Sequence, residues 1–103
     1  MESIFSIYYS EDFEEDLRSI YTHIAYSLQN PFAASEHMNV IISATEALRI
    51  FPKIHRVRRK KSCKEIRVVP VKNFNILYSV DDEKAVVNIL HVFYARRNID
   101  SLP

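Results

Sequence analysis

The 103-residue chain contains no glycine and no tryptophan, a single cysteine and no long hydrophobic run. Without glycine, any turn that needs a positive φ must fall on Asn or Asp, the next most tolerant residue types. The lone Cys63 can form no internal disulfide and cannot build a zinc site by itself. No stretch approaches the ~20 apolar residues of a membrane span, and no leader-like pattern opens the chain. We expect a cytoplasmic protein with no metal, no cofactor and no membrane contact. The candidates for positive φ are Asn30, Asn73, Asp82 and Asn98.

Composition is otherwise that of a soluble globular protein, with 48% hydrophobic and 26% charged residues. This length suits a single domain over residues 1–103. The charges are unevenly placed, because eight Lys or Arg occur between Lys53 and Arg67 against one acid, Glu65. Such a segment is either a solvated loop or a patch that attracts a polyanionic or acidic partner. It shows no helical or strand period, so we predict a loop.

The first half of the chain predicts one strand and two helices. Residues 3–9 (SIFSIYY) alternate and are rich in β-branched and aromatic types, which is typical of a strand. Ser10 is a candidate N-cap for a helix, and Asn30 with Pro31 restarts the helical pattern until Phe51 and Pro52 end it. The short link between the helices predicts an antiparallel hairpin. The first apolar stripe is Phe13, Leu17, Ile20, Ile24 and Leu28, and the second is Ala34, Met38, Ile41, Thr45 and Leu48.

The second half predicts three strands. Residues 66–71 form the first, where Pro70 indicates an edge or a bulge. Residues 74–80 form the next, and an acidic turn at 81–84 leads to a strand over 85–94 that is apolar on both faces and therefore central. The order β-α-α-β-β-β predicts an α+β fold with the helical hairpin packed on one face of the sheet.

Five segments together resemble the RelE/ParE superfamily of bacterial type II toxins: DLRSIYTHIA, NPFAA, LRIFPKIHR, NFNILYSVD and VVNILHVFYARRN. The resemblance implies a twisted antiparallel sheet and a growth-inhibiting toxin held inactive by a cognate antitoxin. Such antitoxins are often acidic and partly disordered, and they fold as they bind. RelE-like members cut mRNA on the ribosome, whereas ParE-like members inhibit DNA gyrase and are not nucleases. We expect first a ribosome-dependent mRNA endoribonuclease of the RelE kind. The alternatives are a gyrase inhibitor of the ParE kind and a degenerate member that only binds its antitoxin.

A metal-independent endoribonuclease needs a base for the 2′-OH, cations for the phosphate and an acid for the leaving oxygen. RelE-like enzymes resemble one another in placing such groups on the open face of the sheet. The resemblance implies catalytic roles for Arg67, Tyr94 and Arg96. The candidates for holding RNA or another target are Arg58, Arg59, Lys60, Lys61, Lys64 and Arg97.

Asn75 is the main departure from the RelE pattern, because a RelE-like arginine would be expected there. The late tyrosine of some members also has no counterpart in the final IDSLP. His91 is a candidate base, but its spacing of three from Tyr94 places the two on opposite faces of a regular strand. Pairing Val80 with Ala85 would put Tyr94 on the face of Asn75, and a shift by one would select His91. A structural role for His91 is the favoured interpretation.

Overall fold

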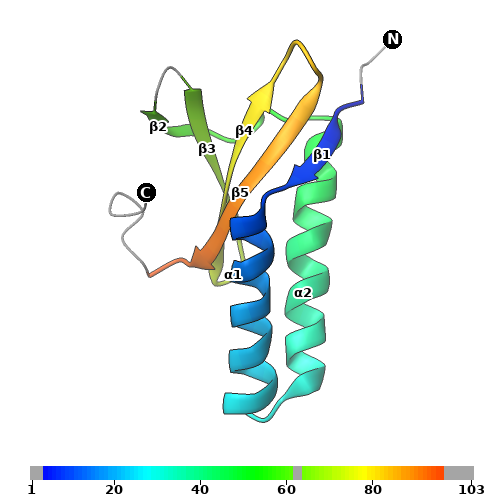
Figure 1. Cartoon of the computed structure of the whole chain (residues 1–103), viewed down its shortest axis with the longest axis vertical. Helices are drawn as coiled ribbons and strands as arrows, with labels where there is room; N and C mark the ends of the chain where they lie inside the picture. The colour runs from blue at the N-terminus through cyan, green and yellow to red at the C-terminus, as the bar shows by residue number, and fades with distance from the viewer. Residues whose placement is uncertain (1–3, 62–63, 97–103) are drawn as a thin grey trace.

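The computed structural model describes residues 4–61 and 64–96, including the side chains of all of these except 59–61 and 64. Two helices cover one face of a five-stranded sheet (Figure 1), in which the strand order is β1-β5-β4-β3-β2. The predicted α+β fold with a one-sided helical hairpin is confirmed. No helix in the described ranges is both long and apolar enough to cross a membrane. The elements are β1 (Ser6–Tyr9), α1 (Glu11–Thr22) with the π-helical turn η1 (His23–Ser27), α2 (Pro31–Glu46) with the 3₁₀ turn η2 (Ala47–Arg49), β2 (Val57–Lys61), β3 (Lys64–Val71), β4 (Phe74–Asp81) and β5 (Val86–Tyr94).

The sheet differs from the prediction in two details. β1 runs parallel to β5, pairing Ser6 with Val86 and Tyr9 with Ile89, so the sheet is mixed rather than wholly antiparallel. The basic segment predicted as a loop contains β2, which pairs antiparallel with β3 at the edge of the sheet. A charged edge strand has no alternating apolar pattern to reveal it, and Lys and Arg at an edge discourage pairing with other chains.

Both helices start where the capping residues predict. The Ser10 hydroxyl accepts the Phe13 N–H at 3.0 Å, and the Asn30 side chain accepts the Ala33 N–H at 3.1 Å. The first stripe is buried only as far as Ile24. The prediction that Leu28 continues it is wrong, because the turn η1 is π-helical and shifts the following residues out of the α-helical phase.

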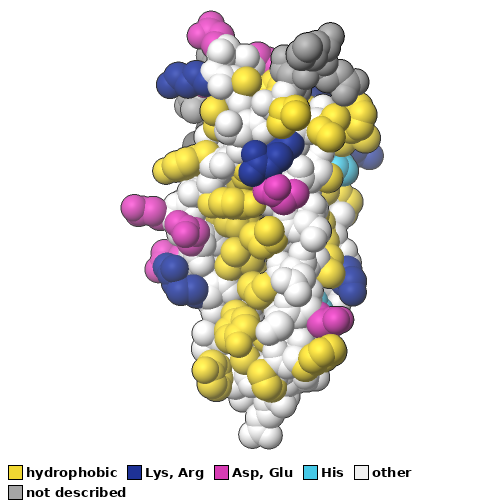
Figure 2. Space-filling model, turned by 90° about the vertical axis from the view of Figure 1, so that its right-hand side faces the viewer, with side chains coloured by type: hydrophobic (Ala, Val, Ile, Leu, Met, Phe, Trp, Pro, Cys, Tyr) yellow, Lys and Arg dark blue, Asp and Glu magenta, His cyan; other side chains and the backbone are white. Residues whose placement is uncertain are grey.

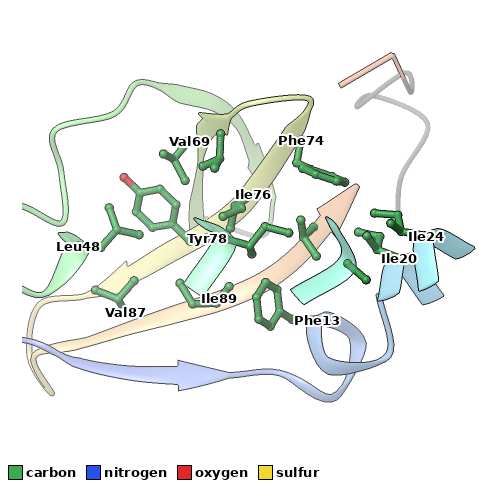
Figure 3. Close-up of a cluster of buried hydrophobic side chains, with 14 of the residues drawn as sticks. Phe13, Ile20, Ile24, Leu48, Val69, Phe74, Ile76, Tyr78, Val87 and Ile89 are labelled. Carbon is green, nitrogen blue, oxygen red and sulfur yellow. The ribbon is translucent and has the colours of Figure 1, made fainter. Parts of the chain in front are cut away.

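The main core lies between the helices and the sheet (Figure 3). Buried side chains of this kind each stabilise the fold by about 1.5–3 kcal/mol relative to exposure. Tyr78 is fully buried, and its hydroxyl donates to the Pro52 carbonyl at 2.8 Å. The hydroxyl thus ties the segment after η2 to the centre of β4. The labelled core residues are Phe13, Ile20, Ile24, Leu48, Val69, Phe74, Ile76, Tyr78, Val87 and Ile89.

Positive φ values occur at Gln29 (51°), Lys72 (52°) and Ala85 (53°). The prediction that Asn30, Asn73 and Asp82 would take them is therefore wrong, and Asn98 lies outside the described residues. The first two lie one residue before the predicted asparagines. Turn geometry fixes which position needs φ > 0, and Asn30 is already used as a helix cap with φ −137°.

Candidate functional site

A bulge in β5 decides which side chains share the sheet face away from the helices. Val80 pairs with Val87 and Leu77 with His91, with the register shift between Leu77 and Tyr78. Both predicted registers of the hairpin are therefore wrong, because four residues separate the paired Asp81 and Val86. Leu90 is the extra residue of the bulge, with no partner on β4.

Past the bulge, His91 pairs with Leu77 and Tyr94 with Phe74. Since directly opposed residues point to the same face, His91 shares the face of Asn75, and Tyr94 points to the helix side. Asn75 itself pairs with Phe93. On β3, Asn75 pairs with Pro70, so both of its cross-strand partners are apolar and neither is a predicted catalytic residue.

His91 is held by the start of α1. Its Nδ1 lies 3.0 Å from Oδ2 of Asp16, and its Nε2 lies 3.9 Å from Oδ2 of Asp12. The same Asp16 oxygen accepts the Val92 N–H at 3.1 Å. One carboxylate therefore joins α1 to β5 where β1 has ended. Nothing in the spacing of the acidic residues of α1 marked Asp16 as this partner.

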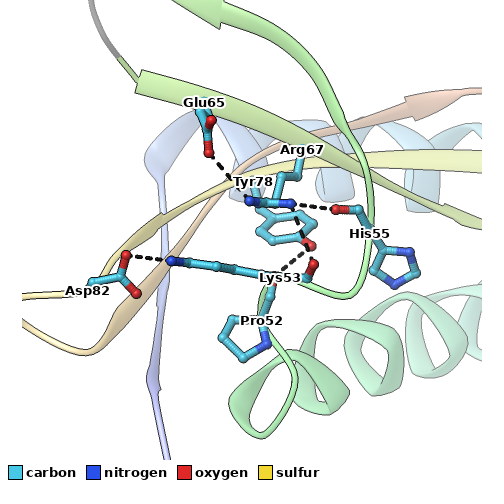
Figure 4. Close-up of polar contacts among 7 residues, drawn as sticks. All are labelled: Pro52, Lys53, His55, Glu65, Arg67, Tyr78 and Asp82. Atoms are coloured by element: carbon cyan, nitrogen blue, oxygen red, sulfur yellow. Dashed lines mark hydrogen bonds and ion pairs between the residues drawn. The ribbon is translucent and has the colours of Figure 1, made fainter.

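Arg67 lies on the helix side of the sheet, because it pairs with the buried Tyr78. Its Nη1 donates to the His55 carbonyl at 2.7 Å and approaches the Lys53 carbonyl at 3.5 Å (Figure 4). Its Nη2 lies 3.4 Å from a Glu65 oxygen, and the side chain is only 14% exposed. The prediction that Arg67 lies on the open face of the sheet is therefore wrong. Its guanidinium instead bonds to the segment that leads into β2.

Burial also shifts two pKa values around this arginine. Burial raises the pKa of the Tyr78 hydroxyl, and the nearby Arg67 charge opposes this shift. Burial lowers the pKa of His55, whose ring stands edge-on to Tyr78 with centroids 6.4 Å apart. The surroundings of Arg67 thus favour a neutral tyrosine and a neutral histidine, as a packed structural region does.

Tyr94 and Arg96 lie far from Arg67. The Tyr94 ring packs on Phe74 with centroids 4.9 Å apart and is 40% exposed. Phe74 and Tyr78, which pair with Tyr94 and Arg67, are four residues apart on β4, or about 13 Å. The three predicted catalytic residues therefore form no common site. Arg96 is exposed just after β5.

The predicted target-binding residues concentrate on the β2–β3 hairpin. Arg58 is exposed on β2, and Lys60 pairs with Glu65 across the hairpin. The backbones of Arg59, Lys61 and Lys64 belong to the same two strands, whereas Arg97 lies outside the described residues. Within residues 4–61 and 64–96, no three His, Cys, Asp or Glu side chains gather as a metal site would.

The face away from the helices is largely apolar. Ile66, Leu77 and Phe93 are buried there, with Val68 and Leu90 packed against them. Along β4 and β5 the register adds the amides or hydroxyl of Asn75, Ser79 and Asn88, the imidazole of His91, and Asp81 at the rim. The part of this face formed by β4 and β5 carries no lysine or arginine.

An apolar groove at another end of the molecule was not predicted. It has a volume of about 450 Å³ and contains one ion pair, Lys53 Nζ to Asp82 Oδ2 at 2.6 Å. Three distant segments of the chain meet there, so no local pattern indicates it. The lining residues are Phe5, Ile50, Phe51, Pro52, Lys53, Ile54 and Asp82.

Similar folds occur in toxin–antitoxin structures. The chromosomal ParDE system of P. aeruginosa matches with a TM-score of 0.72 and 18% identity, over 88% of this chain and 96% of that one. The archaeal RelE–RelB complex of Pyrococcus horikoshii matches with a TM-score of 0.66 and 14% identity, over 92% and 99%. The RelBE2 complex of Mycobacterium tuberculosis gives 0.62 and 15%, over 94% and 98%. At these identities the likeness concerns the fold.

The family is identified by sequence. Comparison with curated protein sequences finds no match. The model of the family described as "ParE toxin of type II toxin-antitoxin system, parDE" matches residues 7–99, which include both helices and every strand after the first residue of β1. The chain therefore belongs to the ParE toxin family of type II toxin–antitoxin systems, within the RelE/ParE superfamily that its motifs resemble.

Proposed function

We propose that this protein inhibits growth by binding DNA gyrase, as a ParE-like toxin without nuclease activity. The observation that carries the proposal is the orientation of Arg67, whose guanidinium is bonded to the His55 carbonyl on the helix side of the sheet. Cleavage of RNA needs a cation beside the scissile phosphate. Arg67, which was expected to supply this cation, instead donates to backbone carbonyls. At the second position where a RelE-like arginine would be expected, the chain has Asn75.

We propose further that a cognate antitoxin holds the toxin inactive in the cytoplasm. The ParDE and RelE–RelB structures of similar fold are toxin–antitoxin systems or complexes. An acidic, partly disordered antitoxin segment would suit a chain with eight Lys or Arg between Lys53 and Arg67.

A ribosome-dependent endoribonuclease is the second candidate, and the His91–Asp16 pair favours it. A histidine oriented by a carboxylate is a common general base. His91 is 23% exposed on the sheet face, with Nδ1 bonded to Asp16. In this case exposed Tyr94 and Arg96 would have to act from the helix side or beyond the strand, and Arg58 and the neighbouring cations would hold the RNA backbone.

The two candidates separate in purified systems. Toxin made by cell-free synthesis is added to gyrase with relaxed plasmid and ATP, and in parallel to ribosomes carrying a defined mRNA. We expect loss of supercoiling or trapped DNA breaks in the first assay and no new mRNA ends in the second. The His91→Gln variant should still inhibit gyrase.

New mRNA ends that disappear in His91→Gln, together with unaffected gyrase, would replace the proposal by the ribonuclease. Inhibition of neither target, with normal growth after induction, would indicate the degenerate member.

A further inference from the structure

Three large apolar side chains are exposed at the tip of the helical hairpin. Tyr26 is 71% exposed, Leu28 is 60% exposed and Phe32 is 75% exposed. They come from the end of η1, the link and the first turn of α2. This tip is the end of the hairpin farthest from the sheet (Figure 1), and hydrophobic side chains are visible at the corresponding lower end in Figure 2.

The backbone at the tip turns Leu28 outward. An uninterrupted α-helix would place Leu28 on the buried stripe, four residues after Ile24. Instead the Leu28 N–H donates to the His23 carbonyl at 3.0 Å, five residues back, and the Asn30 N–H donates to Ile24 at 3.1 Å. Gln29 then takes a φ of 51°, in the left-handed region. Short π-helical turns and unfavourable backbone angles of this kind recur at functional sites.

Local contacts hold the backbone of the tip in place. The Asn30 side chain accepts the Ala33 N–H at 3.1 Å, and Pro31 occupies the first turn of α2, where its fixed φ suits the helix. Apolar groups presented on a rigid scaffold lose little conformational entropy on binding. Leu28 and Phe32 are therefore well prepared to enter a matching site.

Charge and area indicate what kind of partner fits. No Asp, Glu, Lys or Arg occurs between Arg18 and Glu36, so the tip is unsuited to a polyanion or a charged peptide. The three side chains expose on the order of 300–450 Å². A stable contact between two copies needs about 800 Å² from each, so two tips meeting end to end would not hold. A convex apolar tip of this size fits a concave apolar pocket, as one anchor within a larger interface.

We propose that the hairpin tip of Tyr26, Leu28 and Phe32 inserts into an apolar pocket on the protein that the toxin inhibits. This inference rests on the proposed function, in which that protein is DNA gyrase. The tip acts as a recognition element, whereas the contacts of Asp16 with His91 and Val92 hold α1 of the hairpin against the sheet.

The test compares Leu28→Ser and Phe32→Ser with Ile4→Ser, a matched control that is 69% exposed outside the tip. Binding to purified gyrase and growth arrest after induction are measured, with thermal unfolding to show that each variant folds. Loss of an anchor residue should weaken gyrase binding roughly 30-fold and relieve growth arrest. The control should match the wild type, and Phe32→Leu should restore most of the binding because it remains apolar.

Wild-type affinity and growth arrest in both serine variants would overturn the proposal. If the wild type arrests growth without binding gyrase, the proposed function fails, and the tip is then judged by growth arrest alone: relief in both tip variants but not in Ile4→Ser supports it. Tip variants that lose antitoxin binding yet still arrest growth would overturn it, as would a wild type that does not arrest growth.

Discussion

Replacing Arg67 with Met tests whether this arginine supports the fold. The substitution keeps an apolar stem but removes the guanidinium, which leaves the His55 carbonyl without its 2.7 Å donor. A hydrogen bond from a charged group contributes about 1.5–3 kcal/mol. The 3.5 Å approach to Lys53 and the 3.4 Å pair with half-exposed Glu65 add little. We expect a loss of about 2–3 kcal/mol in the free energy of unfolding.

That loss is large for a protein of this size. Domains of about 100 residues are stable by about 5–15 kcal/mol, and each kcal/mol shifts the melting temperature by about 4–8 °C. Arg67→Met should therefore melt roughly 10–20 °C below the wild type. Urea titration and thermal unfolding, both followed by circular dichroism on cell-free material, measure the two quantities.

Arg58→Met is the matched control. Arg58 is exposed on the neighbouring strand, so the same substitution there should change the free energy of unfolding by less than about 0.5 kcal/mol. If Arg67→Met unfolds at the wild-type urea midpoint and yet abolishes toxicity, then Arg67 acts on a target and its structural role is refuted.

Three further substitutions test other parts of the fold. Tyr78→Phe leaves the buried Pro52 carbonyl without its donor and should lower the free energy of unfolding by about 1–2 kcal/mol, so an unchanged urea midpoint would contradict the contact. Ala85→Gly should leave the free energy of unfolding unchanged or raise it, because Ala85 has a φ of 53°. The control Ala44→Gly, within α2, should lower that free energy by about 1 kcal/mol. Equal losses in the two variants would argue against the left-handed turn. Burial lowers the pKa of His55 below 6.5, so the unfolded chain binds the proton first, and the free energy of unfolding falls as the pH drops through 6.5. His55→Gln should flatten this pH dependence in urea titrations from about pH 8 to about pH 5. An unaltered pH dependence would mean that other groups cause it.

Helix starts were predictable because their signals are local. Ser10 and Asn30 cap helices through contacts within three residues, and Pro31 occupies the first turn of α2 as expected. Leu28 was misassigned because the pattern alone does not distinguish an α-helical turn from a π-helical one. Nor could β2 be found, since a run of cations shows no alternation of apolar and polar residues.

The candidate site was harder to predict because it depends on strand register. Both alternating sets of residues on β3 are apolar, so the sequence does not say whether Arg67 or Ile66 faces the helices. Pairing of Arg67 with Tyr78 decides this, and the bulge at Leu90 decides the faces of His91 and Tyr94. Neither is encoded within a few residues.

The parallel pairing of β1 with β5 has a consequence for synthesis of the protein. Ser6 must wait for Val86, eighty residues later in the chain, before it gains its partner. At about 5–20 residues per second, that interval lasts roughly 4–16 s. During translation the nascent chain can form its helical hairpin early, but the sheet against which the hairpin packs is completed only near the end. A growing chain therefore passes through this period without its finished sheet, and the surfaces that depend on the sheet exist only once synthesis is nearly complete.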